Sequence, residues 1–193
     1  GHVPLLERLQ EVAAFELQAG PATGSARFER AWPVPLVKVK LNGSVVLAAV
    51  DPGCPHVLVD PTAMRAARLE RLGGERAVFW IGSHAAAGNA LARSVEIAGF
   101  TFANVPMAST SLHRYSLDVN PMGRDIALVI GLPLLERAGV VMDFRRQRVE
   151  LYRDGTPAVP AGRGQRVPFE RWTENQIVAW GTIGGGRKLA MIV

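Results

Sequence analysis

Apolar and polar residues alternate with a period of two along much of the chain, which is the pattern of half-buried strands. The clearest case is Leu36 to Leu41, where valines lie on one face and lysines on the other. Asn42-Gly43 then predicts a tight hairpin turn, because both residues tolerate positive φ. A second apolar strand, Val45 to Val50, runs directly into Asp51. The pattern therefore predicts a β-hairpin that ends on an acidic residue.

Helical spacing is confined to short segments. Apolar residues recur at helical spacing over 3–19 until Gly20-Pro21 ends the run, and 61–72 has helical composition. A short helix is predicted over Leu134 to Ala138. The other predicted elements are strands at 57–59, 77–81, 92–97, 100–105, 126–130, 140–144 and 147–152, with loops at 21–25, 82–89 and 109–123. Many short strands with few helices indicate a mainly β, barrel-like domain.

The same pattern divides the chain into a main domain and flanking segments. Residues 1–33 are read as an N-terminal helix and linker, 34–152 as the domain, and 153–176 as a linker rich in glycine and proline. Residues 177–193 look like a second copy of 36–50, since both hold a strand, a glycine turn and a second apolar strand. Chance similarity between two hairpins is the alternative. If the repeat is real, we expect the natural protein to continue past Val193 with Asp-Thr/Ser-Gly.

Composition is that of an ordinary globular domain, with 193 residues of which 48% are hydrophobic and 20% charged. No apolar stretch reaches the roughly 18 to 20 residues that cross a bilayer, so no membrane span is predicted. The net charge of +5 and the pI of about 10.1 permit nucleic-acid binding. The arginines are spread along the chain instead of forming a basic stripe, and we therefore expect no nucleic-acid partner.

The cysteines and histidines of the sequence indicate which disulfide and metal chemistry the chain could support. Cys54 is the only cysteine, so no internal disulfide can form. The compartment stays unknown, with a lean towards an extracytoplasmic (periplasmic or secreted) setting. The four histidines lie far apart and lack metal-ligand spacing. Neither a metal nor another cofactor is expected.

Two motifs in a fixed order carry the resemblance to a known family. Val46 to Gly53 (VLAAVDPG) looks like the apolar strand followed by Asp-Thr/Ser-Gly of retropepsin-like, pepsin-type aspartic proteases. Further on, Ala127 to Gly131 (ALVIG) resembles the second signature of that family, and Leu132 to Leu151 is similar to the helix and closing strands of bacterial members. The resemblance covers about residues 34–152. It implies an acid-protease half-barrel with a short helix after the second signature strand.

The resemblance also implies a reaction and a partner. Members hydrolyse peptide bonds with a water that two aspartates activate, and Asp51 would be one member of this dyad. The second would come from another retropepsin-like lobe, in cis or as a homodimer, and the ligand would be a polypeptide substrate or peptide. Gly53 and the Ile130-Gly131 strand end would support the Asp51 loop. A mobile flap over the substrate is expected at Ile81, Gly82, Ser83 and His84.

Pro52 departs from the family pattern. The threonine or serine of the family donates a hydroxyl across the lobe interface, whereas proline has neither a hydroxyl nor a backbone N–H. Proline also biases Asp51 towards extended conformations. Two hypotheses therefore stay open. The first is an aspartic endopeptidase, and the second is a catalytically impaired peptide-binding or scaffolding lobe, a pseudoprotease.

Other chemically capable residues receive simpler interpretations. Cys54 could pair with His56 as a nucleophile, but a small buried cysteine is the preferred reading. The residues Ser109, Ser111, His113 and Asp118 have triad types without a nucleophile elbow and are read as a polar loop. Asp125 and Asp143 are read as surface and turn carboxylates. Gly184 to Lys188 lacks the Ser/Thr of a P-loop, so no nucleotide site is predicted.

Overall fold

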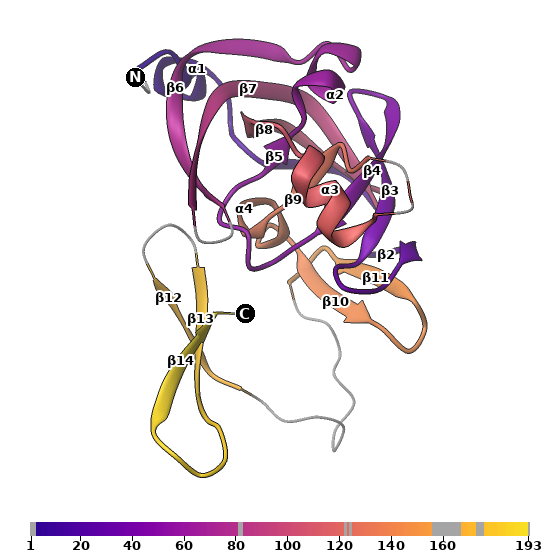
Figure 1. The fold of residues 1–193 in the computed structure, drawn as a ribbon. Helices are drawn as coiled ribbons and strands as arrows, with labels where there is room; N and C mark the ends of the chain where they lie inside the picture. Colours follow the sequence, from indigo (N-terminus) through magenta and orange to yellow (C-terminus); the bar gives the residue numbers. More distant parts are fainter. Residues whose placement is uncertain are drawn as a thin grey trace.

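The fold is built around one large, strongly curved sheet, as the ribbon of the computed structural model shows (Figure 1). The structure describes residues 3–80, 83–121, 123, 125–155, 167–172 and 176–192. The strands of this sheet are β1 (Glu16–Ala19), β2 (Thr23–Arg30), β3 (Leu36–Leu41), β4 (Ser44–Val50), β5 (Leu58–Val59), β6 (Glu70–Trp80), β7 (Ser83–Ile97), β8 (Phe100–Ser109), β9 (Leu128–Ile130), β10 (Gly139–Asp143) and β11 (Arg148–Tyr152). The mainly β fold predicted from the alternating pattern is confirmed.

The strand order turns this sheet into a closed half-barrel. The order is β10-β11-β2-β3-β4-β9-β5-β8-β7-β6, and β3 also pairs with β7, so the strands between them form a ring. The ring encloses an apolar core that includes Val37, Val39, Phe100 and Phe102. Burial of these side chains is the main stabilising contribution to such a fold. β1 lies at the side of the ring and pairs with β8.

The predicted hairpin is present with the expected turn. β3 and β4 are antiparallel and Leu41 pairs with Ser44 across the turn. Asn42 and Gly43 have φ of 48° and 87°, the positive values that a two-residue hairpin turn requires. The Asn42 side chain fixes the turn against β7, because its Oδ1 accepts a hydrogen bond of 3.1 Å from the Ser94 N–H.

In the described residues, four short helices cover parts of the half-barrel. They are α1 (Val3–Glu11), α2 (Pro61–Ala66), α3 (His113–Val119) and α4 (Leu132–Leu135). Asp60 caps α2 by accepting a hydrogen bond of 2.8 Å from the Thr62 N–H, and Pro61 occupies the first turn. No helix in the described part of the chain is long and apolar enough to cross a membrane.

A separate three-stranded sheet comes after the half-barrel in the chain. It consists of β12 (Phe169–Trp172), β13 (Gln176–Thr182) and β14 (Lys188–Ile192) in the order β12-β13-β14. In Figure 1 it lies beside the half-barrel near α4. Arg171 of β12 forms an ion pair of 2.8 Å with Glu136, the residue directly after α4.

Several predicted elements were wrong in extent or type. The N-terminal helix ends at Glu11, and the rest of 3–19 contains β1, whose pairing with β8 overrides the helical spacing. The predicted loop 21–25 contains the start of β2. The predicted loop 82–89 belongs largely to β7, and the helical prediction over 61–72 extends beyond α2 into β6. Long-range strand pairing decided these segments, because it overrides weak local propensities.

Two further segments were also misassigned. The polar loop predicted over 109–123 contains α3, whose buried face holds Tyr115, Ser116 and Val119. Most of the predicted linker 153–176 lies outside the described residues, and its described part contains β12, which pairs with β13. In both cases a partner elsewhere in the chain supplies the stabilising contacts.

Candidate active site

Asp51 lies at the tip of β4, beside the end of β9. β4 and β9 are parallel neighbours, with Val50 opposite Ile130. The Asp51 N–H continues this pairing by donating a hydrogen bond of 3.0 Å to the Ile130 carbonyl oxygen. The two predicted signatures, far apart in the sequence, thus meet at one point of the half-barrel.

The loop after Asp51 turns back on the carboxylate. The Gly53 N–H donates a 3.0 Å hydrogen bond to Asp51 Oδ1, and the Cys54 N–H donates a 3.0 Å hydrogen bond to the Asp51 carbonyl oxygen. Burial raises the pKa of the Asp51 carboxyl above its usual value, while the backbone N–H groups of Gly53 and Cys54 oppose that rise. A carboxyl poised in this way can hold or release a proton nearer to neutral pH than an exposed aspartate.

Gly131 makes room for this loop. A Cβ atom at Gly131 would lie 2.0 Å from the His56 carbonyl oxygen and 2.5 Å from the Cys54 carbonyl oxygen. Its φ of −89° is ordinary, so the need for glycine is steric. The next residue closes the contact, since the Leu132 N–H donates a 2.9 Å hydrogen bond to the Cys54 carbonyl oxygen. Backbone therefore packs directly on backbone beneath the Asp51 loop.

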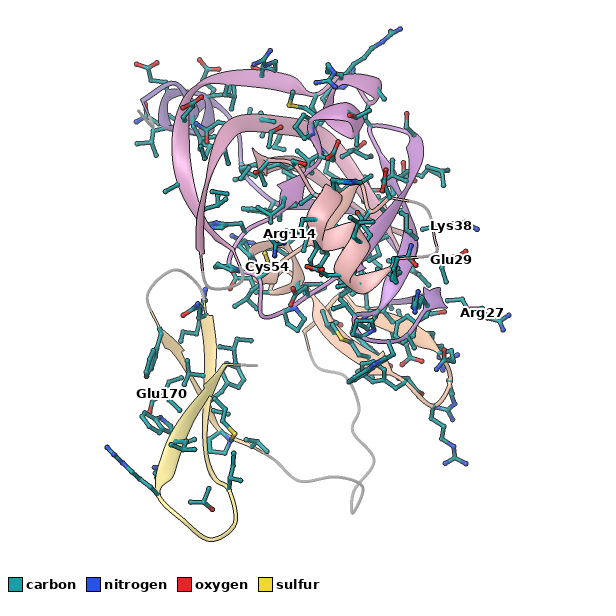
Figure 2. The ribbon with its side chains drawn as sticks, in the orientation of Figure 1. Arg27, Glu29, Lys38, Cys54, Arg114 and Glu170 are labelled. Atoms are coloured by element: carbon teal, nitrogen blue, oxygen red, sulfur yellow. The ribbon has the colours of Figure 1, made fainter. Side chains whose placement is uncertain are left out.

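Cys54 is a buried thiol and not an activated nucleophile. Its Sγ donates a hydrogen bond of 3.2 Å to the His56 carbonyl oxygen. Burial raises the pKa of Cys54 to about 12, so the thiolate needed for nucleophilic attack does not form near neutral pH. Cys54 is buried in the apolar cluster that α3 covers, and Figure 2 shows it close to α4 and α3.

Sequence reasoning missed Tyr115, which lies near the same loop. Tyr115 of α3 is buried in an apolar cluster with Cys54 and Leu112. Burial raises the pKa of its phenol, and the negative charges of Asp51 and Cys54 raise it further. A signal was present in the sequence, because Leu112, Tyr115 and Val119 are spaced like the apolar face of a helix. The polar residues between them concealed it.

The predicted flap residues lie at the end of the long hairpin of β6 and β7. Ser83 and His84 begin β7 and pair with Trp80 and Phe79 of β6. Ile81 and Gly82 lie outside the described residues. The hairpin packs on α3 as well, since Val78 and Ala87 belong to the cluster that contains Tyr115.

The structure does not bring other titratable residues to Asp51 to form a dyad within the described chain. Asp143 is the last residue of β10, where its half-buried side chain accepts a 2.8 Å hydrogen bond from the Arg146 N–H through Oδ1. That bond lowers the pKa of Asp143. Asp125 is exposed and lies 3.9 Å from His113 Nδ1. Among the described residues, no group of three or more His, Cys, Asp and Glu side chains could hold a metal ion.

Comparison with known proteins places this geometry in a family. A family model described as aspartyl protease matches residues 37–134, which include Asp51, the hairpin of β6 and β7, and Gly131. The chain belongs to the aspartyl protease family. The resemblance to retropepsin-like proteases that the motifs suggested is thereby confirmed, and the fold of this aspartyl protease lobe is the predicted half-barrel.

Two solved structures similar to the aspartyl protease lobe have low sequence identity to it. One is a retropepsin-like aspartic protease from Rickettsia conorii, with 16% identity and a TM-score of 0.46, covering 67% of this chain and 90% of that chain. Another is the retroviral protease-like domain of Ddi1 from Leishmania major, with 17% identity and a TM-score of 0.39, covering 68% and 98% of the two chains. No curated protein matches the chain.

Proposed function

We propose that the chain provides one catalytic lobe of an aspartic endopeptidase, with Asp51 as one of two carboxylates that activate a water molecule. The observation that carries the proposal is the Asp51 carboxyl itself. It lies at a strand tip, accepts a hydrogen bond from the Gly53 N–H, and has a pKa raised by burial. Family membership supports the reaction class.

Hydrolysis requires a base to activate water and an acid to protonate the substrate carbonyl oxygen. Two neighbouring carboxyls meet both needs, because close like charges cannot ionise together and one proton is shared. Asp51 alone cannot do this. A second carboxyl must approach from the open side of its loop.

The repeated sheet supports a second lobe in cis. β12, β13 and β14 repeat the order and antiparallel pairing of β2, β3 and β4. The pairing of Arg171 with Ile177 has the same position in its sheet as the pairing of Arg30 with Leu36. The second hairpin has a longer turn, because Thr182 pairs with Lys188 where Leu41 pairs with Ser44.

The position of the small sheet supports the same proposal. A cavity of about 610 Å³ lies between it and the half-barrel, with Pro52 and Leu135 on one side and Phe169 and Ile177 on the other. Arg171 and Glu136, which form an ion pair, also line this cavity. A second lobe that began with this sheet would start next to the Asp51 loop.

A cleavage assay on the natural full-length protein tests the catalytic proposal. Denatured casein and a mixed peptide library are incubated with protein from pH 4 to 7, and new termini are counted by mass spectrometry. Asp51→Asn should abolish cleavage, whereas Asp143→Asn, which removes a carboxyl at the end of β10 that is bonded to Arg146, should leave it unchanged. Cleavage that persists in Asp51→Asn would refute the assignment of Asp51.

Dilution of the protein distinguishes a second carboxyl that a lobe of the same chain supplies from one that a second copy supplies. Activity per mole stays constant on dilution if the second lobe is in cis, and it falls if two copies must associate. In the cis case, the full-length protein sediments as a monomer while fully active.

The competing scaffold function rests on Pro52. Pro52→Thr restores the hydroxyl of the family motif and should raise the cleavage rate if the loop is only weakened. A pseudoprotease would show no cleavage in either form, yet pepstatin would still raise its melting temperature by binding the folded groove.

A further inference from the structure

A second pocket lies at the base of the β6–β7 hairpin, away from Asp51. We call it the flap-base pocket. It has a volume of about 640 Å³ and is lined by residues of α2 and of the beginning of the hairpin. Figure 1 shows these two elements near one another. Its lining includes the polar side chains of Arg65, Arg71, Glu75 and Asn89 and the apolar side chains of Met64 and Leu72. Its size suits a small ligand.

The charges in this pocket favour an anion. Arg65 comes from the last turn of α2 and Arg71 from β6, so two separate elements contribute an arginine to the lining of one cavity. The Arg65 guanidinium also donates a 3.3 Å hydrogen bond to Thr62 Oγ1. Neither arginine forms an ion pair with a described residue, and Glu75 is the only acidic residue in the lining. Two cations against one anion leave a net positive site. Guanidinium groups bind carboxylates well because their N–H geometry matches.

Asn89 contributes a buried hydrogen-bond acceptor that lacks a donor among the described residues. It is only 3% exposed, and its Nδ2 donates to the Gly73 and Gly74 carbonyl oxygens at 3.3 and 3.4 Å. These glycines lie where the register of β6 and β7 shifts between Leu72 and Glu75. No donor among the described residues reaches Asn89 Oδ1. A buried acceptor without a donor is costly, so a ligand N–H at this position is favoured.

The three features together specify one kind of ligand. A peptide's C-terminal residue carries a carboxylate, an N–H on the same Cα and a side chain. We propose that the flap-base pocket binds the C-terminal residue of a peptide with an apolar side chain. The arginines take the carboxylate, Asn89 Oδ1 accepts the adjacent N–H, and the side chain contacts Met64 and Leu72. Binding does not require hydrolysis by Asp51.

N-acetyl-L-leucine is the probe, titrated into the full chain by isothermal calorimetry and by amide chemical shifts. Two analogues remove one feature each. N-acetyl-L-leucinamide lacks the carboxylate, and 2-acetoxy-4-methylpentanoic acid replaces the N–H with an ester oxygen. Each analogue should bind at least tenfold more weakly than the probe. The chemical shift changes should centre on α2 and the start of β6.

Protein variants test the two cations. Arg65→Gln and Arg71→Gln should each weaken binding of the probe at least tenfold, and both side chains are exposed enough for the fold to tolerate the change. Arg27→Gln, an exposed arginine of β2 on another part of the surface, is the matched control and should not alter the affinity (Figure 2).

Three results would overturn the proposal: no binding of the probe, equal binding of the amide, or equal weakening by Arg27→Gln. The result is independent of the catalytic proposal, because Asp51→Asn should retain full affinity for N-acetyl-L-leucine. A protein that binds the probe but cleaves nothing would keep the pocket and lose the protease assignment.

Discussion

The two three-stranded sheets share an order and a pairing scheme but differ in what covers them. In the sheet of β2, β3 and β4, Phe28 is 6% exposed and Val39 is 3% exposed. In the sheet of β12, β13 and β14, Val178 and Ala179 are buried, but Phe169 is 58% exposed and Trp180 is 40% exposed. Strands β3 and β4 of the first sheet are closed into a ring by β9, β5, β8 and β7, whereas in the described chain the second sheet pairs only within itself.

This difference shows that a local alternating pattern is enough to form a sheet. A buried core forms only where other strands or helices pack against that sheet. The second sheet compensates with surface contacts among its own side chains. Glu170, marked in Figure 2, accepts hydrogen bonds from the indole N–H groups of Trp172 and Trp180 at 3.4 and 3.1 Å. Lys188 lies 5.3 Å from the centre of the Trp180 ring. Such contacts are weak compared with burial in a core.

Truncation of the matched phenylalanines should show the largest contrast. Phe28→Ala should lower the free energy of unfolding by about 3 to 5 kcal/mol, because it leaves a cavity in the core. Phe169→Ala should change it by less than about 0.5 kcal/mol, as expected for an exposed side chain. Urea unfolding followed by tryptophan fluorescence and circular dichroism measures both. Similar losses in the two variants would mean that the second sheet is covered in solution.

The next contrast concerns the Asp51 loop at the end of the first sheet, which packs on Gly131. Gly131→Ala should lower the free energy of unfolding by about 1 to 3 kcal/mol, since the new methyl group meets backbone that cannot move freely. Gly88→Ala is the control, because a Cβ there has no atom within 4 Å. It should be nearly neutral in the same urea titration. A neutral Gly131→Ala would contradict the close packing of the loop.

The pH dependence of stability distinguishes Asp51, whose pKa is raised by partial burial, from a carboxyl whose pKa is lowered by hydrogen bonds. Because the pKa of Asp51 is raised in the folded state, the folded form binds a proton more tightly than the unfolded form. Stability therefore decreases as pH rises from the ordinary aspartate pKa through the folded one. Asp51→Asn should remove that decrease, so the variant melts higher than the wild type at pH 7.

Asp143 supplies the opposite sign as a control. Its pKa is lowered in the folded state by the Arg146 N–H, so its contribution is present above the ordinary aspartate pKa and is lost as pH falls. Asp143→Asn should melt no higher than the wild type at pH 7. Melting curves from pH 3 to 8 test both variants, and a lower melting temperature of Asp51→Asn at pH 7 would contradict the raised pKa of Asp51.

The smallest effect is expected where the two parts of the molecule touch. Arg171→Gln breaks the ion pair with Glu136. The side chain of Arg171 is 50% exposed and that of Glu136 is 28% exposed. The loss should be below about 1 kcal/mol because water screens such pairs. A double-mutant cycle with Glu136→Gln, measured in low and high salt, isolates the coupling. If the coupling free energy does not decrease at high salt, the Arg171–Glu136 pair is more deeply buried in solution than in this structure.

Much of the fold could be predicted where the alternation of apolar and polar residues matches the two-residue period of a strand. The strand Leu36 to Leu41, the Asn42-Gly43 turn and the approach of Asp51 to Gly131 result from alternation, turn chemistry and two motifs. The predicted secondary structure was wrong where pairing with a strand distant in the sequence determined it. β1, the start of β7 and β12 have weak local signals, and each is fixed by a neighbouring strand. The catalytic role of Asp51 stays a prediction.

The amino-acid sequence by itself determined the period of the strands, the position of Asp51 at a strand tip, and the family, because these depend on neighbours along the chain. Only the tertiary structure decided how far each side chain is buried. It placed Tyr115 near the Asp51 loop and left Asn89 Oδ1 without a donor among the described residues. The physical reason is that desolvation and steric contact depend on atoms brought together from distant segments, and no local pattern encodes those distances.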